Sequence, residues 1–425
     1  MSLKVSELMK VDYLSGLDWD AQHADTRYMT HAFHQYASKY IPQIPFNLVS
    51  KLSDKNDLVL DNFVGSGTTL VECKLLGRNS IGVDVNPLAC LISKVKSTNF
   101  SDRELQNILR VCDSIKRNID CLRNHNQGCN STRRRRRIIG NNILNKEFRQ
   151  QEYKNFFSSN IPHSLSKIML QQNIPHSNIL KWFSDNVICE LLVIKSAVDS
   201  AEDDNSRDFL LVAFSSILRN LSNAHEGFGN LMRNKQPIPK SRIYEKFCIT
   251  VNRMIKGMWE FNKRVAQNQT ASNNITAKIV RGDSRNLNFI DNKTIDLICS
   301  HPPYMSAVPY AEYQKLSLWW LGYSPPEIEK ETIGGRRTSA GTSSRFLDDM
   351  RLVIRETKRV LKPRKYCCII VGNPTYAGEK MQLNEFIKTE AKDVGFFLLS
   401  EILRRKYRLT TGRIKEEFIL IFKNE

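Results

Sequence analysis

The chain has 425 residues, of which 41% are hydrophobic, and it carries a net charge of +19. This length is enough for two or three domains with a large core. No run of about 18 apolar residues is present, which excludes a transmembrane helix, and the N-terminal sequence lacks the apolar segment of a secretion signal. The positive charge favours a polyanionic partner, most simply nucleic acid, over a merely soluble basic protein. We therefore expect a cytoplasmic protein with no membrane partner.

The ten cysteines indicate free thiols and no metal site. They form no Cys-x-x-Cys pair, and Cys121, His125 and Cys129 do not have the spacing of a standard zinc site. Free thiols are expected in a reducing cytoplasm.

Residues 57–84 have the pattern strand, glycine loop, helix, strand. A buried strand at 57–63 is followed by the loop Val64-Gly-Ser-Gly-Thr-Thr69, a helix at 70–76 and a second strand at 80–84 that ends in Asp84. Glycines allow a ligand close to the backbone, and the helix N-terminus offers N–H donors. An acid at the second strand tip suits ribose hydroxyls. A dinucleotide fold prefers a third glycine where Leu70 stands, so the pattern favours another adenosine cofactor.

Residues 101–274 interrupt this pattern and are mainly helical and basic. Residues 101–270 hold 27 Lys and Arg against 16 Asp and Glu. Clusters of this kind most often contact phosphates. Together with a Gly-rich loop near residue 336, the segment supplies the DNA-binding candidates, which are Arg133, Arg134, Arg135, Arg136, Arg137, Lys235, Lys240, Arg242, Arg336 and Arg337.

The α/β pattern resumes after residue 274. A strand at 278–283 ends in Gly282-Asp283, and a buried strand at 296–299 runs into Ser300-His-Pro-Pro-Tyr304. The two prolines give that loop a preset shape, and their carbonyls remain acceptors. Helices are expected at 310–321, 346–361 and 380–394, and strands at 366–371, 398–405 and 417–422.

In combination, these motifs resemble the amino-methylating DNA methyltransferases, which methylate cytosine N4 or adenine N6 with S-adenosylmethionine. The similarity covers about residues 20–96 and 278–425. It implies a Rossmann-like α/β methyltransferase sheet with a large, mainly helical inserted domain, divided as 1–100, 101–274 and 275–425. It also implies double-stranded DNA as partner, a nucleoid-associated location in the cytoplasm, and allows a cognate restriction endonuclease that acts separately.

The resemblance assigns the site residues in two groups. Ser300, His301, Pro302, Pro303 and Tyr304 correspond to the catalytic loop, with Tyr304 as the face on which a flipped base stacks. The cofactor-binding set comprises Tyr36, Lys39, Asp61, Phe63, Gly65, Ser66, Gly67, Thr68, Thr69, Asp84, Asn86, Asp283 and Ser284.

His301 stands where the family usually has Asp, Asn or Ser, and this leaves the target base open. Asp or Asn is typical of adenine-N6 enzymes and Ser of cytosine-N4 enzymes. A neutral imidazole, with an ordinary pKa of about 6.5, resembles the uncharged Ser type, so we expect cytosine N4 over adenine N6. An RNA amino-methyltransferase, a nucleotide-dependent oxidoreductase and a catalytically silent DNA-binding protein are the competing readings.

The Arg133–Arg137 run generates the first prediction. Replacing all five arginines with alanine should weaken DNA binding to a similar extent on every sequence and flatten its salt dependence, because arginines in a loop most often meet phosphates. Binding titrations at several salt concentrations measure both quantities. A changed sequence preference with an unchanged salt slope would contradict the phosphate role.

Overall fold

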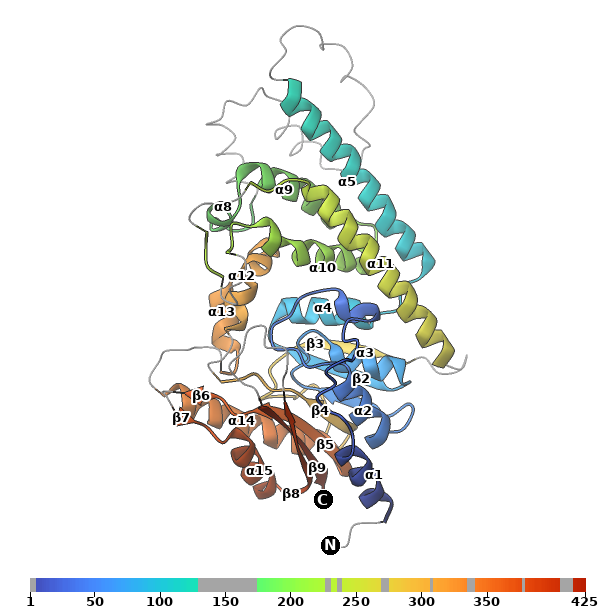
Figure 1. Cartoon of the computed structure of the whole chain (residues 1–425), viewed down its shortest axis with the longest axis vertical. Coiled ribbons are helices and arrows are strands. Elements are labelled where there is room, and N and C mark those ends of the chain that lie inside the picture. Colours follow the sequence, from blue (N-terminus) through green and yellow to red (C-terminus); the bar gives the residue numbers. More distant parts are fainter. Residues whose placement is uncertain are drawn as a thin grey trace.

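The computed structural model describes residues 5–128, 174–225, 231–234, 239–268, 275–305, 309–334, 341–376, 379–405 and 416–425. Its centre is a seven-stranded sheet in the order β3-β2-β1-β4-β5-β9-β8 (Figure 1). The strands are β1 (Leu58–Asp61), β2 (Asn79–Asp84), β3 (Ala277–Arg281), β4 (Ile295–Ser300), β5 (Leu361–Gly372), β8 (Phe396–Arg405) and β9 (Glu416–Asn424). Strands β1 to β5 are parallel, and β9 is antiparallel to both of its neighbours. This arrangement confirms the Rossmann-like α/β fold.

Helices cover both faces of the sheet. Successive residues of a strand point to opposite faces, so each strand contributes apolar side chains to a cluster on either side. In β1, Val59 packs into the apolar cluster under α1 and α2, whereas Leu60 packs into the cluster under α14 and α15. In β4, Leu297 and Ile298 divide in the same way. The helices around the sheet are α1 (Val5–Ser15), the 3-10 turn η1 (Met29–Ala32), α2 (Gln43–Leu52), α3 (Thr68–Leu75), α4 (Pro87–Ser97), α12 (Tyr310–Trp320), α13 (Pro325–Glu331), α14 (Thr342–Val360) and α15 (Leu383–Asp393).

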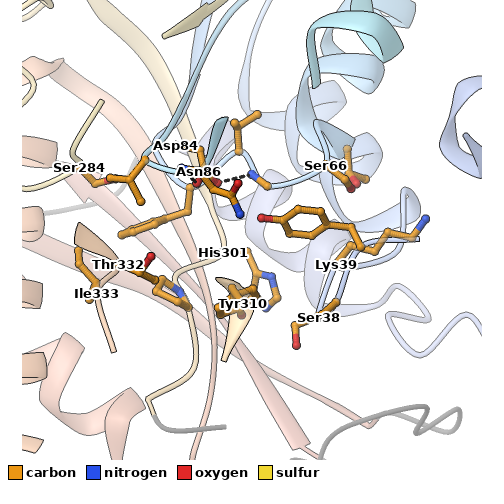
Figure 2. A pocket seen from close by; sticks show the side chains of 18 of the residues that line it. Ser38, Lys39, Ser66, Asp84, Asn86, Ser284, His301, Tyr310, Thr332 and Ile333 are labelled. Carbon is orange, nitrogen blue, oxygen red and sulfur yellow. Dashed lines mark hydrogen bonds between the residues drawn. The ribbon is translucent and has the colours of Figure 1, made fainter. Parts of the chain in front are cut away.

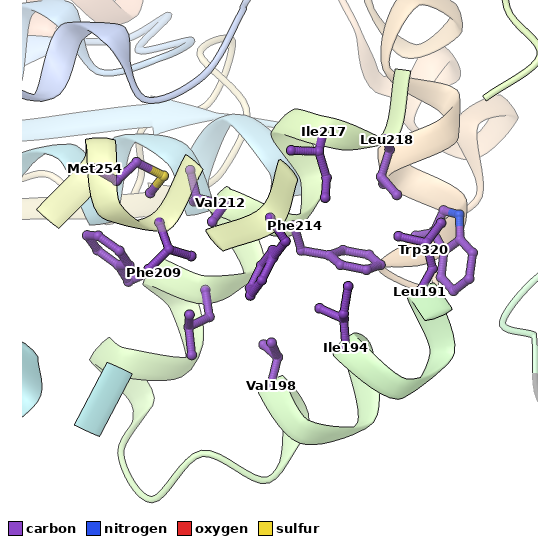
Figure 3. Close-up of a cluster of buried hydrophobic side chains, with 14 of the residues drawn as sticks. Leu191, Ile194, Val198, Phe209, Val212, Phe214, Ile217, Leu218, Met254 and Trp320 are labelled. Carbon is purple, nitrogen blue, oxygen red and sulfur yellow. The ribbon is translucent and has the colours of Figure 1, made fainter. Parts of the chain in front are cut away.

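Helices between α4 and β3 form a layer on one side of the sheet (Figure 1). They are α5 (Asp102–Gly128), α8 (Ile179–Trp182), α9 (Asp185–Asp199), α10 (Asp204–Leu221) and α11 (Ile243–Asn268). Their apolar cluster is shared with other parts of the chain. Trp320 of α12 meets Phe214 of α10 edge to face at 5.5 Å, and residues of α3 and α4 belong to the same cluster (Figure 3). The division into 1–100, 101–274 and 275–425 stays a prediction; the inserted helices share one apolar cluster with α3, α4 and α12 from the two flanking segments.

The expected closing strands are confirmed as the antiparallel pair β8 and β9. Strand β5, however, begins at Leu361 rather than at residue 366. Its pairing with β4 jumps from Ile295↔Leu361 to Leu297↔Tyr366. Pro363 has no N–H to donate, and Arg364 has a φ of +63°, so the strand bulges here. A separate short hairpin is formed by β6 (Thr375–Tyr376) and β7 (Glu379–Lys380).

Across the described ranges, no helix combines the length and apolar character needed to cross a membrane.

The shared core generates a stability prediction. Phe214 is completely buried between the inserted helices and Trp320, so Phe214→Ala should cost about 3–5 kcal/mol in the free energy of unfolding. Ile249→Ala is the control, because Ile249 is 68% exposed on α11. Chemical unfolding followed by circular dichroism measures both. A variant in which the inserted helices unfold in a separate step, with α3, α4 and α12 unaffected, would contradict the shared cluster.

Candidate functional site

The carboxyl ends of four parallel strands surround one cavity. It encloses about 750 Å³ including its open mouth. Segments 36–40, 63–66, 84–86, 283–284 and 331–333 line it together with Thr68, His301, Pro303 and Tyr310 (Figure 2). Residues from both halves of the α/β pattern thus meet at one place, as expected for ligands of open α/β sheets.

The glycine loop brings the backbone to the cavity wall. Gly67 has a φ of +76°, and a Cβ there would lie 2.8 Å from the Cα of Ser93, so no other residue fits this turn without displacing α4. Next to it, the hydroxyl of Ser66 is buried and has no hydrogen-bond partner among the described residues, although Ser66 lines the cavity. An unpaired buried hydroxyl is costly, so this atom is suited to bind a ligand.

Asp84, at the tip of β2, binds the glycine loop. Its two carboxylate oxygens accept backbone N–H groups of Gly65 at 3.0 Å and Asn86 at 2.9 Å. Burial raises the pKa of Asp84 to about 6, although these two hydrogen bonds oppose the shift. A carboxylate offers about four acceptor sites, so Asp84 retains capacity for ligand hydroxyls.

Asp283, after β3, is held by an arginine. Arg285 donates from Nε and Nη2 to the Asp283 carboxylate at 2.6–3.0 Å and from Nη1 to Asp349 of α14 at 2.9 Å. Asp283 still lines the cavity. The neighbouring Ser284 donates its hydroxyl to the carbonyl of Asn62. Sequence analysis predicted Asp283 and Ser284 but not their partners.

The N-terminal segment forms another wall. Lys39 donates to the carbonyl of His31 at 3.0 Å, and burial lowers the pKa of its ammonium to about 8. Tyr40 shares hydrogen bonds with Thr69 and Asp61 behind the wall. The ring of Tyr40 also meets His301 edge to face at 5.1 Å. Segment 36–40 therefore joins the glycine loop to the catalytic loop.

The loop after β4 contains two candidates for a polar contact with a substrate, Ser300 and His301, and only one of them faces the cavity. Ser300 donates its hydroxyl to Oδ1 of Asn62 at 2.6 Å and does not line the cavity, whereas His301 does. Pro303 also lines it, but Pro302 and Tyr304 do not. The Tyr304 ring is 3% exposed, and its hydroxyl contacts Glu417 and His301. Tyr304 as a stacking face stays a prediction, and in this conformation its ring is turned into the protein.

Most of the predicted cofactor residues reach the cavity. Those that line it are Tyr36, Lys39, Phe63, Gly65, Ser66, Thr68, Asp84, Asn86, Asp283 and Ser284. Asp61, Gly67 and Thr69 lie behind this lining. Sequence reasoning missed Tyr40, Tyr310, Thr332 and Ile333. Tyr40 and Tyr310 adjoin recognised motifs, but no pattern singles out Thr332 and Ile333.

Two of the predicted DNA-binding residues are described by the structure. Lys240 and Arg242 lie immediately before α11, near α9, where the carbonyl of Lys240 accepts from Asn186 at 3.3 Å. The others, Arg133 to Arg137, Lys235, Arg336 and Arg337, lie outside the described residues. No group of three or more possible metal-binding side chains occurs in the part of the chain that the structure describes.

Comparisons with known proteins point to DNA methylation. Residues 19–95 match the N6/N4 DNA methylase family model. The chain is 23% identical to the Type II methyltransferase M.MjaII of Methanocaldococcus jannaschii, covering 84% of this chain and 75% of that protein. It is 24% identical to the Type II methyltransferase M.MvaI of Kocuria varians, covering 83% and 79%. A putative DNA modification methylase of Thermus thermophilus, complexed with S-adenosyl-L-methionine, shares 21% identity over 34% of this chain and 53% of its own, with a TM-score of 0.24.

The raised pKa of Asp84 generates a binding prediction. Hydroxyl donors favour its ionised form, so the affinity for S-adenosylmethionine should fall as pH drops through about 6, by up to about tenfold per pH unit below it. Asp84→Asn should bind more weakly by about 1–3 kcal/mol and lose this pH dependence. Calorimetry from about pH 8 to 5 tests both, with Asp208→Asn as the control on α10. An unchanged pH profile in Asp84→Asn would assign the titration to another group.

Proposed function

We propose that this chain, a member of the amino-methylating N4/N6 family of DNA methyltransferases, transfers a methyl group from S-adenosylmethionine to cytosine N4 in double-stranded DNA. The observation that carries the proposal is the shared cavity: His301 and Pro303 line it together with Gly65 and Asp84. Cofactor and target base would therefore meet in one enclosed space. The base must leave the duplex to enter it.

The lining residues fit the cofactor. Asp84 would accept the ribose hydroxyls, and Asp283, which lies after the neighbouring strand, would meet the edge of the adenine ring. Tyr36, Lys39 and Ser66 would hold the remainder, and the unpartnered Ser66 hydroxyl supports a ligand at this end. When bound, S-adenosylmethionine supplies an electrophilic methyl group on a positively charged sulfur.

His301 and the adjacent backbone would activate the amino group. Its lone pair is delocalised into the ring, so it is a weak nucleophile. Hydrogen bonds from the amino group to the His301 imidazole and to the carbonyl of Pro302 would localise that pair, and a fixed position facing the methyl group supplies the rest. Pro302 does not line the cavity in this conformation, so its carbonyl would have to turn towards the bound base. The commitment of the Ser300 hydroxyl to Asn62 supports His301 in this role. Imidazolium cannot accept a hydrogen bond, so the reaction needs neutral His301.

Cytosine is favoured because the side chain at the first tetrapeptide position is an uncharged acceptor rather than a carboxylate. Adenine N6 is the alternative, and an RNA amino group is the next. We also propose that residues 101–274 recognise the target sequence, because they hold the excess of positive charge. The names of the relatives, Type II methyltransferases, support a separate restriction endonuclease as a partner in the cell.

The product identifies the target base. DNA methylated by the purified protein should give N4-methyl-2′-deoxycytidine on enzymatic hydrolysis and mass spectrometry, and His301→Ala should give none while still binding S-adenosylmethionine. DNA from cells without the gene is the control. N6-methyladenine as the sole product would overturn the choice of base but not the reaction class, and methylation of RNA alone would overturn the DNA substrate.

A further inference from the structure

A lysine is almost completely buried behind the glycine loop. Lys96 of α4 is 1% exposed, and its amine donates to the carbonyl of Ser66 at 2.6 Å. Burial lowers the pKa of this amine well below its ordinary value; Lys39 adds to the shift and Glu72 opposes it. Burying an amine costs free energy, and lysine is almost never fully buried unless it is paired. None of the motifs recognised in the sequence includes Lys96.

Lys96 belongs to a buried polar cluster that joins the N-terminal segment to the cofactor loop. Glu72 of α3 accepts from the Tyr28 hydroxyl at 2.6 Å and lies 2.8 Å from Nε2 of His31. The carbonyl of His31 accepts in turn from Lys39, which lines the cavity. These contacts fix segment 28–39, α3 and α4 relative to one another at one end of the cavity.

The hydrogen bond from Lys96 determines which groups of the glycine loop face the cavity. Ser66 lines the cavity and Lys96 does not, so the Ser66 carbonyl is bound by a partner behind the wall. The buried Ser66 hydroxyl has no hydrogen-bond partner among the described residues. Helix α3 begins beside it at Thr68, and the first N–H groups of a helix have no intrahelical acceptor. Together with the helix dipole, these donors favour an anion.

The two ends of the cavity differ in polarity. In Figure 2, Ser66 and Ser284 lie on opposite sides of the cavity, and Asp283, which precedes Ser284, brings a carboxylate to the far side. S-adenosylmethionine has a single anionic group, the carboxylate of its methionine part. That group suits the donor-rich end at Ser66. A carbonyl oxygen turned into the cavity there would repel it.

We propose that Lys96 is a positioning residue for the cofactor: it holds the Ser66 carbonyl behind the cavity wall and so leaves the Ser66 hydroxyl and the N-terminus of α3 to bind the carboxylate of S-adenosylmethionine. This inference deepens the proposed function and rests on the placement of the cofactor given there. It assigns the end of the cofactor opposite to the one placed at Asp283.

Lys96→Met tests the proposal. Methionine fills the same space but cannot donate, so the Ser66 carbonyl is left buried and unpaired, and its peptide is free to turn towards the cavity. Calorimetry compares S-adenosylmethionine with decarboxylated S-adenosylmethionine, which lacks only the carboxylate. We expect Lys96→Met to lose roughly ten- to hundredfold in affinity for S-adenosylmethionine and little for the decarboxylated compound. A general structural role would weaken both ligands equally.

Two further variants separate the hydrogen bond from folding. Lys96→Gln is as long as methionine but keeps an N–H donor for the Ser66 carbonyl, so it should recover part of the preference for the carboxylate. Ser66→Ala leaves Lys96 in place, is expected to fold, and should lose the same preference because the accepting carboxylate loses its hydroxyl donor. Circular dichroism confirms that each variant is folded before its affinities are compared.

Lys358→Met is the matched control. The Lys358 amine also donates to a backbone carbonyl, that of Gly395 at 2.7 Å, and its loss should change neither affinity. Equal losses for both ligands in Lys96→Met, or an unchanged preference in Ser66→Ala, would overturn the proposal. The binding measurements need no DNA. If the preference changes as expected but the wild-type protein methylates no cytosine, the proposed target fails while the role of Lys96 stands.

Discussion

The site depends on the hydrogen bonds of Asn62 at the tip of β1. Its side-chain oxygen accepts from Ser300, at the end of β4, and its backbone oxygen accepts from Ser284, beyond β3. Ser300 and Ser284 come from the half of the sequence beyond the inserted helices, whereas Asn62 precedes them. Asn62 is fully buried, so these bonds are protected from water and fix the position of the loop that follows β4. His301 can face the cavity because Ser300 faces away from it.

The inserted helices contribute to the same geometry through packing. Trp320 of α12 inserts among residues of α8 to α10, and α12 begins at the cavity residue Tyr310. Gln314 of α12 in turn accepts from Asn86 at 2.6 Å, beside the tip of β2. A displacement of α10 against the sheet would therefore reach the cavity wall through α12. A segment expected to recognise DNA is thus packed directly against α12, which contributes Tyr310 to the candidate site.

The sequence predicted the local elements of the site well and their partners poorly. Strand tips, the glycine loop and the Pro-Pro loop have signals within a few residues, such as Gly65-Ser-Gly67 or Pro302-Pro303, because their conformations are set by backbone chemistry. Glu417 and Arg404 gave no such signal. Both lie on expected strands, but their buried pairing with each other follows from the register of β8 on β9. The inward orientation of Tyr304 has the same cause, since its partner is more than a hundred residues away.

The distribution of charge favours different binding places for the cofactor and for the DNA backbone in the proposed function. The whole chain carries +19, yet the described residues that line the cavity include the carboxylates Asp84, Asp283 and Glu331 and the ammonium of Lys39, with Arg285 paired to Asp283 from outside the lining. Carboxylates in the lining suit a cofactor with a positively charged sulfur and disfavour phosphates. In the proposed function, the DNA backbone would therefore bind on basic surfaces outside the cavity, and only an uncharged base would enter. The proposed reaction uses the neutral form of His301, and in that form the residue would hold the base by hydrogen bonds without adding charge to the cavity.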